Sequence, residues 1–292
     1  MSLGRLAPLG IAVVVGVLAS GAHRRIRPAA SATLLAAVMG ITLVAAVPSA
    51  LVAAAGFVAH PPAFGGSMAW CHEMFGVHPY IDPWLGAAAT LWSTIAVWRV
   101  IRVVRSTRRL RRDDVGEMEV VDDEVPYAFT MPGAGGRVLV STGLISALDP
   151  TQFAVVVAHE RAHARHRHDR YALLGDLAAA IVPPLAPVRR RLRFELERWA
   201  DEAAVRETDG DRRIVAETLA HVALLADERA AFPLGFNGLG VAARVEALLR
   251  PPDLDHHAAW RATFSSATVI VAVAAAVQLH HSLGLLHIVC PG

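Results

Sequence analysis

Two histidines and a glutamate in the middle of the chain have the types and spacing of a metal-dependent hydrolytic site. His159, Glu160 and His163 form the pattern H-E-x-x-H inside a segment, Val155 to Arg167, that is predicted to be helical. Side chains four residues apart lie on one face of a helix, so the two imidazoles can bind one metal ion. Glu160 would lie beside that ion, where a carboxylate can take a proton from water. The pattern predicts a zinc site that hydrolyses peptide bonds.

A third metal ligand is expected on a later helix, from Arg191 to about Arg206. Two histidines and one further protein ligand leave a fourth position open for water. Glu197 and Asp201 are four residues apart and therefore share a helix face. We expect Glu197 to bind the metal and Asp201 to accept a hydrogen bond from the outward nitrogen of a ligand histidine. Taken alone, an E-x-x-x-D pattern in an arginine-rich helix is more often a surface salt-bridge array.

The sequence also predicts the elements that hold these residues. Asp149-Pro150-Thr151-Gln152 has the features of a helix start: an aspartate cap, proline at the first helical position and glutamine three residues after the cap. Beyond the motif, His166 and His168 belong to a polar run and are interpreted as solvated residues near the helix end. Before it, β-like runs with a hairpin signal between the last two predict a small sheet. These runs are Met118–Val121, Tyr127–Met131 and Arg137–Ser141.

The composition indicates a membrane protein. The chain has 292 residues, of which 54% are hydrophobic and only 18% are charged, which is too apolar for an ordinary soluble domain. Four segments are long enough, or nearly so, to cross about 30 Å of hydrocarbon as helices. They are Leu6–Ala22, Ala29–Ala59, Pro83–Val104 and Thr263–Leu286. We therefore expect a membrane domain at 1–104, a cytoplasmic peptidase domain at 105–262, and a fourth span with a short tail at 263–292.

A fifth apolar stretch, Tyr171–Val188, is just long enough to span. Asp176 and Pro183-Pro184 interrupt it, and a buried carboxylate and a double proline argue against a membrane-spanning helix. We expect this stretch to pack on the peptidase domain or to lie at the membrane face. If it enters the bilayer, it must return to the same side.

Arginine positions predict the orientation of the chain. There is no lysine, and arginines cluster after the first and third apolar segments, whereas residues 60–82 contain none. Because positive residues favour the cytoplasmic side, the N-terminus and the tail are expected outside and the H-E-x-x-H helix inside. Cys71 and Cys290 both fall in the outer regions. A disulfide between them is permitted there, and two free thiols are the equally weighted alternative.

The motifs resemble those of the gluzincin membrane peptidases. His159-Glu160-Arg161-Ala162-His163 with Glu197-Arg198-Trp199-Ala200-Asp201 looks most like the BlaR/MecR type of antirepressor metallopeptidase, with the HtpX type and the CAAX prenyl protease as wider relatives. The resemblance implies a mostly α fold with a small β-hairpin sheet, in which multi-span membrane helices accompany a cytoplasmic zincin-like metallopeptidase domain. It also implies one Zn²⁺ per chain, bound by His159, His163 and Glu197. Family members that sense β-lactams carry an external penicillin-binding domain, and since this chain stops at Gly292, direct antibiotic sensing is not expected.

Two further roles follow from the resemblance. Arg244 resembles a late arginine of HtpX-type enzymes and is the candidate that stabilises the oxyanion of the reaction; a structural ion pair is the alternative. In thermolysin-like peptidases an edge strand before the metal helix pairs with the substrate backbone. The predicted hairpin could act in this way or simply pack against the helix.

The expected function is that of an integral-membrane zinc endopeptidase that cleaves a cytoplasmic or membrane-associated protein. This would be a transcriptional repressor if the chain is antirepressor-like, or a damaged membrane protein if it is HtpX-like. The alternative is a non-catalytic membrane signalling or scaffold protein with a vestigial site. The expected partners are a protein or peptide substrate and the lipid bilayer. Its headgroups would contact arginines that recur every three residues where the third helix leaves the bilayer: Arg99, Arg102, Arg105 and Arg108. Nucleic acid is not expected, because no recognition motif accompanies these arginines. A homo-oligomer is left open by the sequence.

Overall fold

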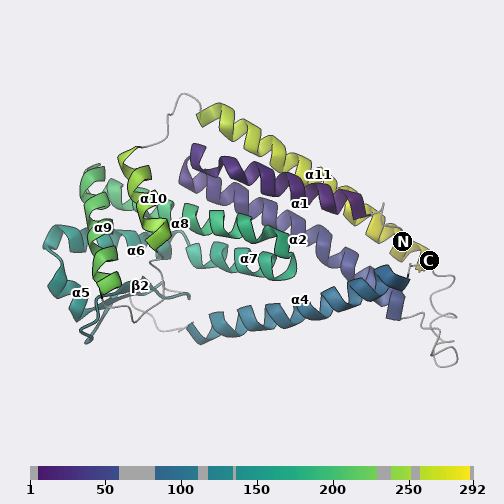
Figure 1. The fold of residues 1–292 in the computed structure, drawn as a ribbon, viewed down its shortest axis with the longest axis horizontal. Coiled ribbons are helices and arrows are strands. Elements are labelled where there is room, and N and C mark those ends of the chain that lie inside the picture. Colours follow the sequence, from purple (N-terminus) through teal and green to yellow (C-terminus); the bar gives the residue numbers. More distant parts are fainter. Residues whose placement is uncertain are drawn as a thin grey trace.

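The protein is described by a computed structural model that covers residues 6–58, 83–110, 118–133, 136–228, 238–250 and 257–289. Long helices fill one half of the molecule, and shorter helices gather with a three-stranded sheet at the other end (Figure 1). This arrangement confirms the predicted fold class, mostly α with a small sheet beside apolar helices that could span a membrane.

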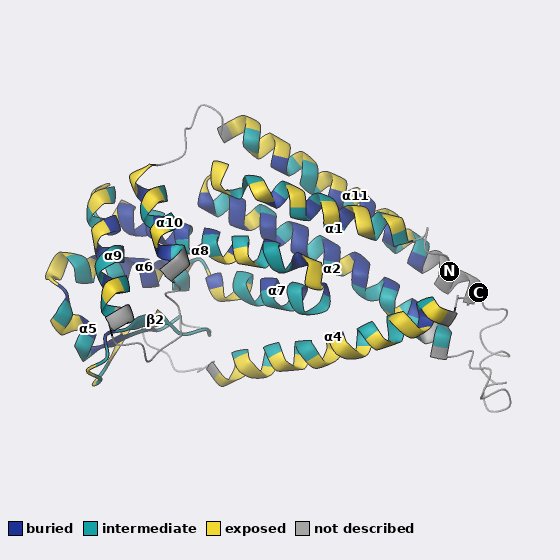
Figure 2. Ribbon diagram, viewed as in Figure 1, coloured by how far each residue is buried: buried dark blue, intermediate teal, exposed yellow. Residues whose placement is uncertain are grey.

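Among the described residues, four helices are long and apolar enough to cross a membrane. They are α1 (Ala7–Ala19) with its 3₁₀ continuation η2 (Ser20–Arg25), α2 (Pro28–Val58), α4 (Pro83–Leu110) and α11 (His257–Val289). These are the four segments that the sequence predicts as spans. Helix α11 packs along α1 and α2, whereas much of α4 is exposed (Figure 2). Large apolar side chains such as Leu91 and Trp98 lie on the exposed surface of α4, as a lipid-facing helix requires.

The start of α1 and the end of α11 lie at one end of the long helices, and the sheet with α6, α9 and α10 lies at the other (Figure 1). The arginine-rich ends of η2 and α4 point toward this second end. The sheet and the arginine-rich helix ends thus lie on the same side of the apolar helices, and the cytoplasmic placement of that side stays a prediction. Cys71 and Cys290 and the loop 60–82 lie outside the described residues, so the disulfide stays a prediction.

The stretch Tyr171–Val188 forms part of a helical hairpin. Helix α7 (His168–Ile181) leads through a short 3₁₀ turn, η3 (Pro183–Leu185), into α8 (Ala186–Glu207). Both α7 and α8 pack against α2, and α7 also contacts α4. Leu185 and Leu192 are fully buried in one core with Leu35 of α2, and each buried leucine contributes about 1.5–3 kcal/mol. The hairpin thus attaches α8 to the membrane helices.

The sheet has the strand order β1-β3-β2. Its strands are β1 (Met118–Val121), β2 (Ala128–Thr130) and β3 (Val138–Ser141), close to the predicted bounds. β2 and β3 form the expected antiparallel hairpin, with Thr130 opposite Val138, and β1 pairs with β3 in parallel. β2 is therefore an edge strand, and it lies against the helix that carries the H-E-x-x-H motif.

Helix α6 (Pro150–Arg165) begins where the sequence predicts. The side chain of Asp149 accepts hydrogen bonds from the backbone of Thr151 and Gln152, and the side chain of Gln152 accepts one from the backbone of Asp149. This capping box satisfies backbone donors that the first turn leaves free. Helices α5 (Thr142–Ala147), α9 (Arg212–Glu228) and α10 (Gly238–Leu249) complete this end of the molecule.

Candidate metal centre

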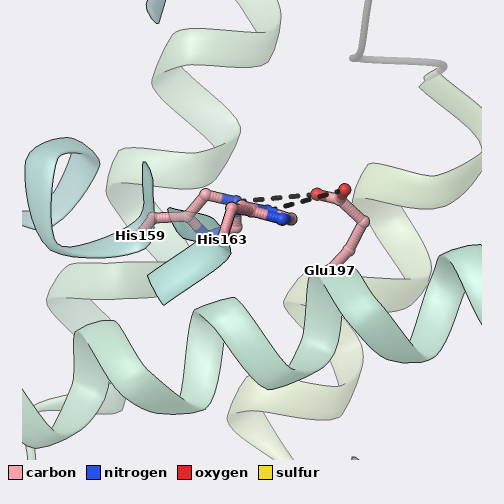
Figure 3. A group of neighbouring side chains, drawn as sticks. All are labelled: His159, His163 and Glu197. Carbon is pink, nitrogen blue, oxygen red and sulfur yellow. Dashed lines mark hydrogen bonds and ion pairs between the residues drawn. The ribbon is translucent and has the colours of Figure 1, made fainter. Parts of the chain in front are cut away.

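His159, His163 and Glu197 meet between α6 and α8 (Figure 3). The Nε2 atoms of the two histidines are 3.1 Å apart. The carboxylate of Glu197 lies 3.6 Å from Nε2 of His159 and 3.8 Å from Nε2 of His163. Two imidazole nitrogens and a carboxylate oxygen are a donor set that zinc prefers. These residues therefore fit the ion that the sequence predicts.

Small residues bring the two helices close enough for this meeting. Ala162 on α6 packs with Ala200 and Ala203 on α8, and all three are almost completely buried. Side chains of this size allow two helix backbones to approach closely. His159 and His163 then lie one turn apart on α6, facing the turn of α8 that carries Glu197.

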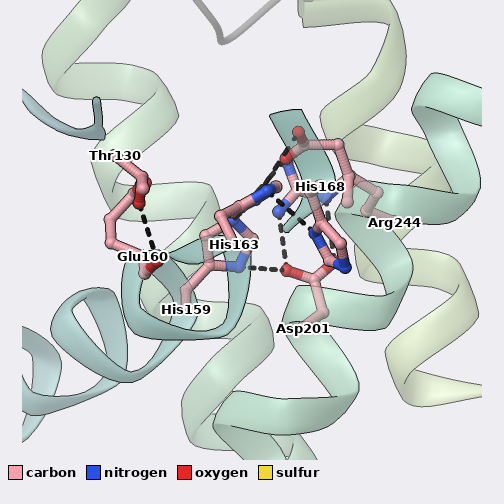
Figure 4. Close-up of polar contacts among 8 residues, drawn as sticks. Thr130, His159, Glu160, His163, His168, Asp201 and Arg244 are labelled. Carbon is pink, nitrogen blue, oxygen red and sulfur yellow. Dashed lines mark hydrogen bonds and ion pairs between the residues drawn. The ribbon is translucent and has the colours of Figure 1, made fainter. Parts of the chain in front are cut away.

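Asp201 and Arg244 lie next to the candidate ligands: Asp201 contacts His159 (Figure 4), and Arg244 contacts both Asp201 and Glu197. Asp201 Oδ1 is 3.0 Å from Nδ1 of His159, the contact that the sequence predicts for Asp201. Arg244 on α10 donates from Nε and Nη2 to Asp201, at 2.8 and 2.6 Å, and its Nη1 is 3.0 Å from Glu197. The guanidinium is thus an ion-pair partner of both carboxylates, as in the alternative interpretation of Arg244. The predicted oxyanion role stays untested.

These charges set the protonation of the buried groups. Burial alone would raise the pKa of the Asp201 and Glu197 carboxyls, but Arg244 and the neighbouring histidines together outweigh burial and lower both pKa values. Burial alone would lower the pKa of His159, but its contacts with the carboxylates of Asp201 and Glu197 raise it to about 10. Burial lowers the pKa of His163. Without a metal, His159 therefore carries a proton that a metal ion would have to displace.

Glu160 is buried and points toward the edge strand. The hydroxyl of Thr130 on β2 lies 2.8 Å from Oε2 of Glu160 and 2.7 Å from its backbone oxygen. Thr130 therefore restrains the carboxylate that the sequence assigns as general base. The sequence analysis did not identify Thr130, because a contact across 30 residues has no local signal.

His168 is a correction to the sequence interpretation. The structure shows it almost fully buried, with Nδ1 3.0 Å from Nδ1 of His163 (Figure 4), so it is not a solvated residue. Its ring packs against Trp199 of α8, and burial lowers its pKa to about 3. His166, interpreted in the same way, is half-buried and stacks on Trp199 as well.

Two pockets meet at the motif. One is a cleft in front of Glu160, His163 and Glu197, with walls from β2, α6, α7, α8 and the last turns of α4. The other is mainly apolar, with Val155, Leu219 and Val222 among its lining residues. Ala128, His159 and Glu160 line both pockets. A chain lying along β2 would therefore pass Glu160 with an apolar pocket beside it.

Residues 97–223 match the sequence model of Peptidase family M48. The chain carries a peptidase M48 domain. The match extends from α4 into α9 and includes His159, Glu160, His163, Glu197 and Asp201, whereas Arg244 lies beyond it.

The chain is also similar to a curated relative, the protease HtpX homolog of Thermoplasma acidophilum. The two sequences are 31% identical over 85 residues, which is 28% of this chain and 26% of the relative. The chain thus matches about a quarter of the relative's length. Together with the four apolar helices, these findings support an M48 membrane metallopeptidase and confirm the expected likeness to the HtpX type. They do not test the BlaR/MecR type.

Proposed function

We propose that this protein is an integral-membrane zinc endopeptidase. The observation that carries the proposal is the convergence of His159, His163 and Glu197, with Glu160 beside them. M48 peptidases are zinc metalloproteases, and the two imidazoles and one carboxylate leave the fourth position of a tetrahedral site open. His159, His163 and Glu197 would hold the ion. When bound there, zinc supplies Lewis acidity that lowers the pKa of a water molecule and polarises the scissile carbonyl.

The protein's own residues would then handle the protons. Glu160 accepts a proton from the attacking water at its carboxylate and passes it to the leaving amine nitrogen. Thr130, 2.8 Å from Oε2 of Glu160, holds that carboxylate at the edge of β2. Asp201 accepts a hydrogen bond from Nδ1 of His159, which keeps Nε2 free to ligate. Arg244 orients Glu197 and Asp201, and remains the candidate donor to the oxyanion.

The edge strand supports an extended peptide as the substrate. Within the part of the chain that the structure describes, β2 pairs with β3 alone, and Ala128, Phe129 and Thr130 line the cleft. An unpaired strand edge can bind another chain through backbone hydrogen bonds. The adjoining apolar pocket favours a substrate with an apolar side chain next to the scissile bond.

The arrangement of helices supports cleavage at the cytoplasmic membrane surface. The arginine-rich ends of η2 and α4 lie on the side of the M48 domain, and the positive-inside rule puts that side in the cytoplasm. The substrate would be a cytoplasmic or membrane-associated protein. The resemblance to the BlaR/MecR type favours a transcriptional repressor, whereas the HtpX-type relative favours a membrane protein.

A Glu160→Gln variant tests this proposal against a non-catalytic scaffold. The full chain would be purified in detergent with zinc and incubated with casein as an unfolded protein substrate. We expect wild type to cleave it and Glu160→Gln to lose at least about 100-fold in rate while binding zinc normally. Glu217→Gln is the matched control, because this exposed glutamate on α9 pairs only with exposed Arg213 in the described part of the chain.

Equal cleavage by wild type and Glu160→Gln would refute the assigned general base. A wild-type chain that binds zinc but cleaves no protein, and whose cellular phenotype survives Glu160→Gln, would favour the scaffold. Peptides released by the wild-type protein alone would identify the sequence at the scissile bond, and therefore test the preference for an apolar side chain.

A further inference from the structure

The two histidines of the candidate metal centre contact different residues through their outward nitrogen atoms. The outward Nδ1 atom of His159 is 3.0 Å from a carboxylate oxygen of Asp201. The outward Nδ1 atom of His163 is 3.0 Å from Nδ1 of His168. The inward Nε2 atoms face each other at 3.1 Å. Each histidine thus directs Nε2 into the centre and contacts a neighbouring side chain through Nδ1.

Ligation fixes the direction of the hydrogen bond between His163 and His168. A neutral imidazole that binds a metal through Nε2 carries its hydrogen on Nδ1. Nδ1 of His163 must then donate, so Nδ1 of His168 must accept. His168 consequently carries its own hydrogen on Nε2, a buried atom with no hydrogen-bond partner among the residues that the structure describes. This tautomer is the one that leaves Nε2 of His163 free for the metal.

We propose that His168 is a positioning residue that accepts a hydrogen bond from His163 and so holds Nε2 of His163 toward the metal. This inference rests on the proposed function only in requiring that His159, His163 and Glu197 bind a divalent ion. It assigns a role to a residue outside the H-E-x-x-H and E-x-x-x-D motifs. His168 is not one of the three candidate ligands; it acts through His163.

The fold holds His168 in place from two sides. Helix α6 ends at Arg165, and Arg167 adopts a left-handed conformation, φ 53°, before α7 starts at His168. This conformation is unfavourable for a residue other than glycine, and it reverses the chain so that His168 faces back toward His163. On the other side, the ring of Trp199 lies 4.9 Å from that of His168. Because Trp199 is on the same helix as Glu197, α8 supplies both a candidate ligand and the support for His168.

The experiment compares zinc affinity among three variants of the full chain in detergent, measured by competition with a chromogenic chelator. His168→Leu keeps a similar volume without an acceptor, and His168→Asn places an amide oxygen close to the position of Nδ1. His166→Leu is the matched control, because His166 also stacks on Trp199, at 4.7 Å, but its ring makes no hydrogen bond in the described part of the chain. Melting temperatures of the metal-free proteins report any change in folding.

We expect His168→Leu to weaken zinc binding about 10–100-fold. The zinc affinities of His168→Asn and His166→Leu should stay within about threefold of wild type. His168→Asn keeps an acceptor for His163, and His166 supplies no acceptor in the wild-type protein. Recovery by asparagine separates positioning from simple packing, which leucine would satisfy at least as well. If His168→Leu does not fold, the zinc affinity of His168→Asn is compared with that of wild type alone, and a clear loss counts against the role of His168.

Wild-type affinity in His168→Leu, or equal losses in the leucine and asparagine variants, would overturn the role of His168. The proposed metal site would still stand in either case. A wild-type chain that binds no zinc would instead refute the metal site, and the role of His168 with it.

Discussion

Nδ1 of His159 lies 3.0 Å from Asp201, and Asp201 accepts two hydrogen bonds from Arg244. The carboxylate therefore connects a candidate metal ligand to a buried cation. This connection selects the tautomer of His159 that leaves Nε2 free, and it keeps Asp201 charged inside the protein. The properties of the centre should thus depend on residues that do not contact the ion.

Replacing Asp201 with asparagine tests this dependence. The variant keeps the shape of the side chain and an acceptor oxygen but removes the charge that Arg244 and His159 share. We expect zinc affinity to fall about 10–100-fold and hydrolysis to fall with it. Chelator competition measures the affinity, and unchanged binding would show that the negative charge of Asp201 is not needed for His159 to bind zinc.

Arg244→Met should destabilise the metal-free protein by about 3–5 kcal/mol, because it leaves two carboxylates in the site without their cation. Bound zinc should recover part of this loss, since the ion brings positive charge to Glu197. Urea denaturation with and without zinc measures both effects. Arg250→Met, which removes an exposed pair with Glu246, should unfold like wild type. A loss of stability that zinc does not reduce would contradict the shared charge.

A variant at Glu195 distinguishes the contribution of helix α8 to folding stability from its contribution to metal binding. Its carboxylate is fully buried, 2.6 Å from Nδ1 of His23 on η2 and 3.0 Å from Arg198. Glu195→Ala should lower the free energy of unfolding by about 3 kcal/mol, because it leaves the buried side chain of Arg198 without this carboxylate partner. Zinc stoichiometry should not change, since Glu195 points away from the metal centre toward the membrane helices. Loss of zinc from a folded Glu195→Ala variant would show that this contact is needed to assemble the site.

Zinc binding should strengthen as the pH rises. The pKa of His159 is raised to about 10, so at neutral pH the imidazole is protonated, and the ion must displace that proton. The pKa values of His163 and Glu197 are lowered, so these ligands are already deprotonated. Apparent affinity should therefore increase about tenfold per pH unit between about pH 6.5 and 8.5. A flat profile over this range would mean that His159 is neutral before zinc arrives.

The catalytic motif and its helix could be predicted because their signals are local. H-E-x-x-H fixes His159 and His163 one turn apart, and the Asp149 cap marks where the helix begins. The three strands, including β2 with Thr130, were also predicted to within one residue at each end. Each of these features depends on spacing along one element, which the sequence carries directly.

The contacts between elements could not be predicted in this way. The αL turn at Arg167 brings His168 back to His163, but an arginine gives no sign of that conformation, so His168 was wrongly interpreted as solvated. Thr130 meets Glu160 across two elements, and Glu195 meets His23 across 172 residues. Such pairs depend on how helices pack, which periodicity within one element does not specify.

Zinc content is the most direct test of the account. The full chain and its Glu197→Gln and Glu202→Gln variants would be loaded with zinc, dialysed against a weak chelator and analysed for metal per chain. Glu202 is on the same helix but pairs with Arg212 at 2.7 Å, so it is the matched control. We predict about one zinc per chain in wild type and in Glu202→Gln, and almost none in Glu197→Gln. A Glu197→Gln variant that keeps one zinc per chain would contradict the proposed site.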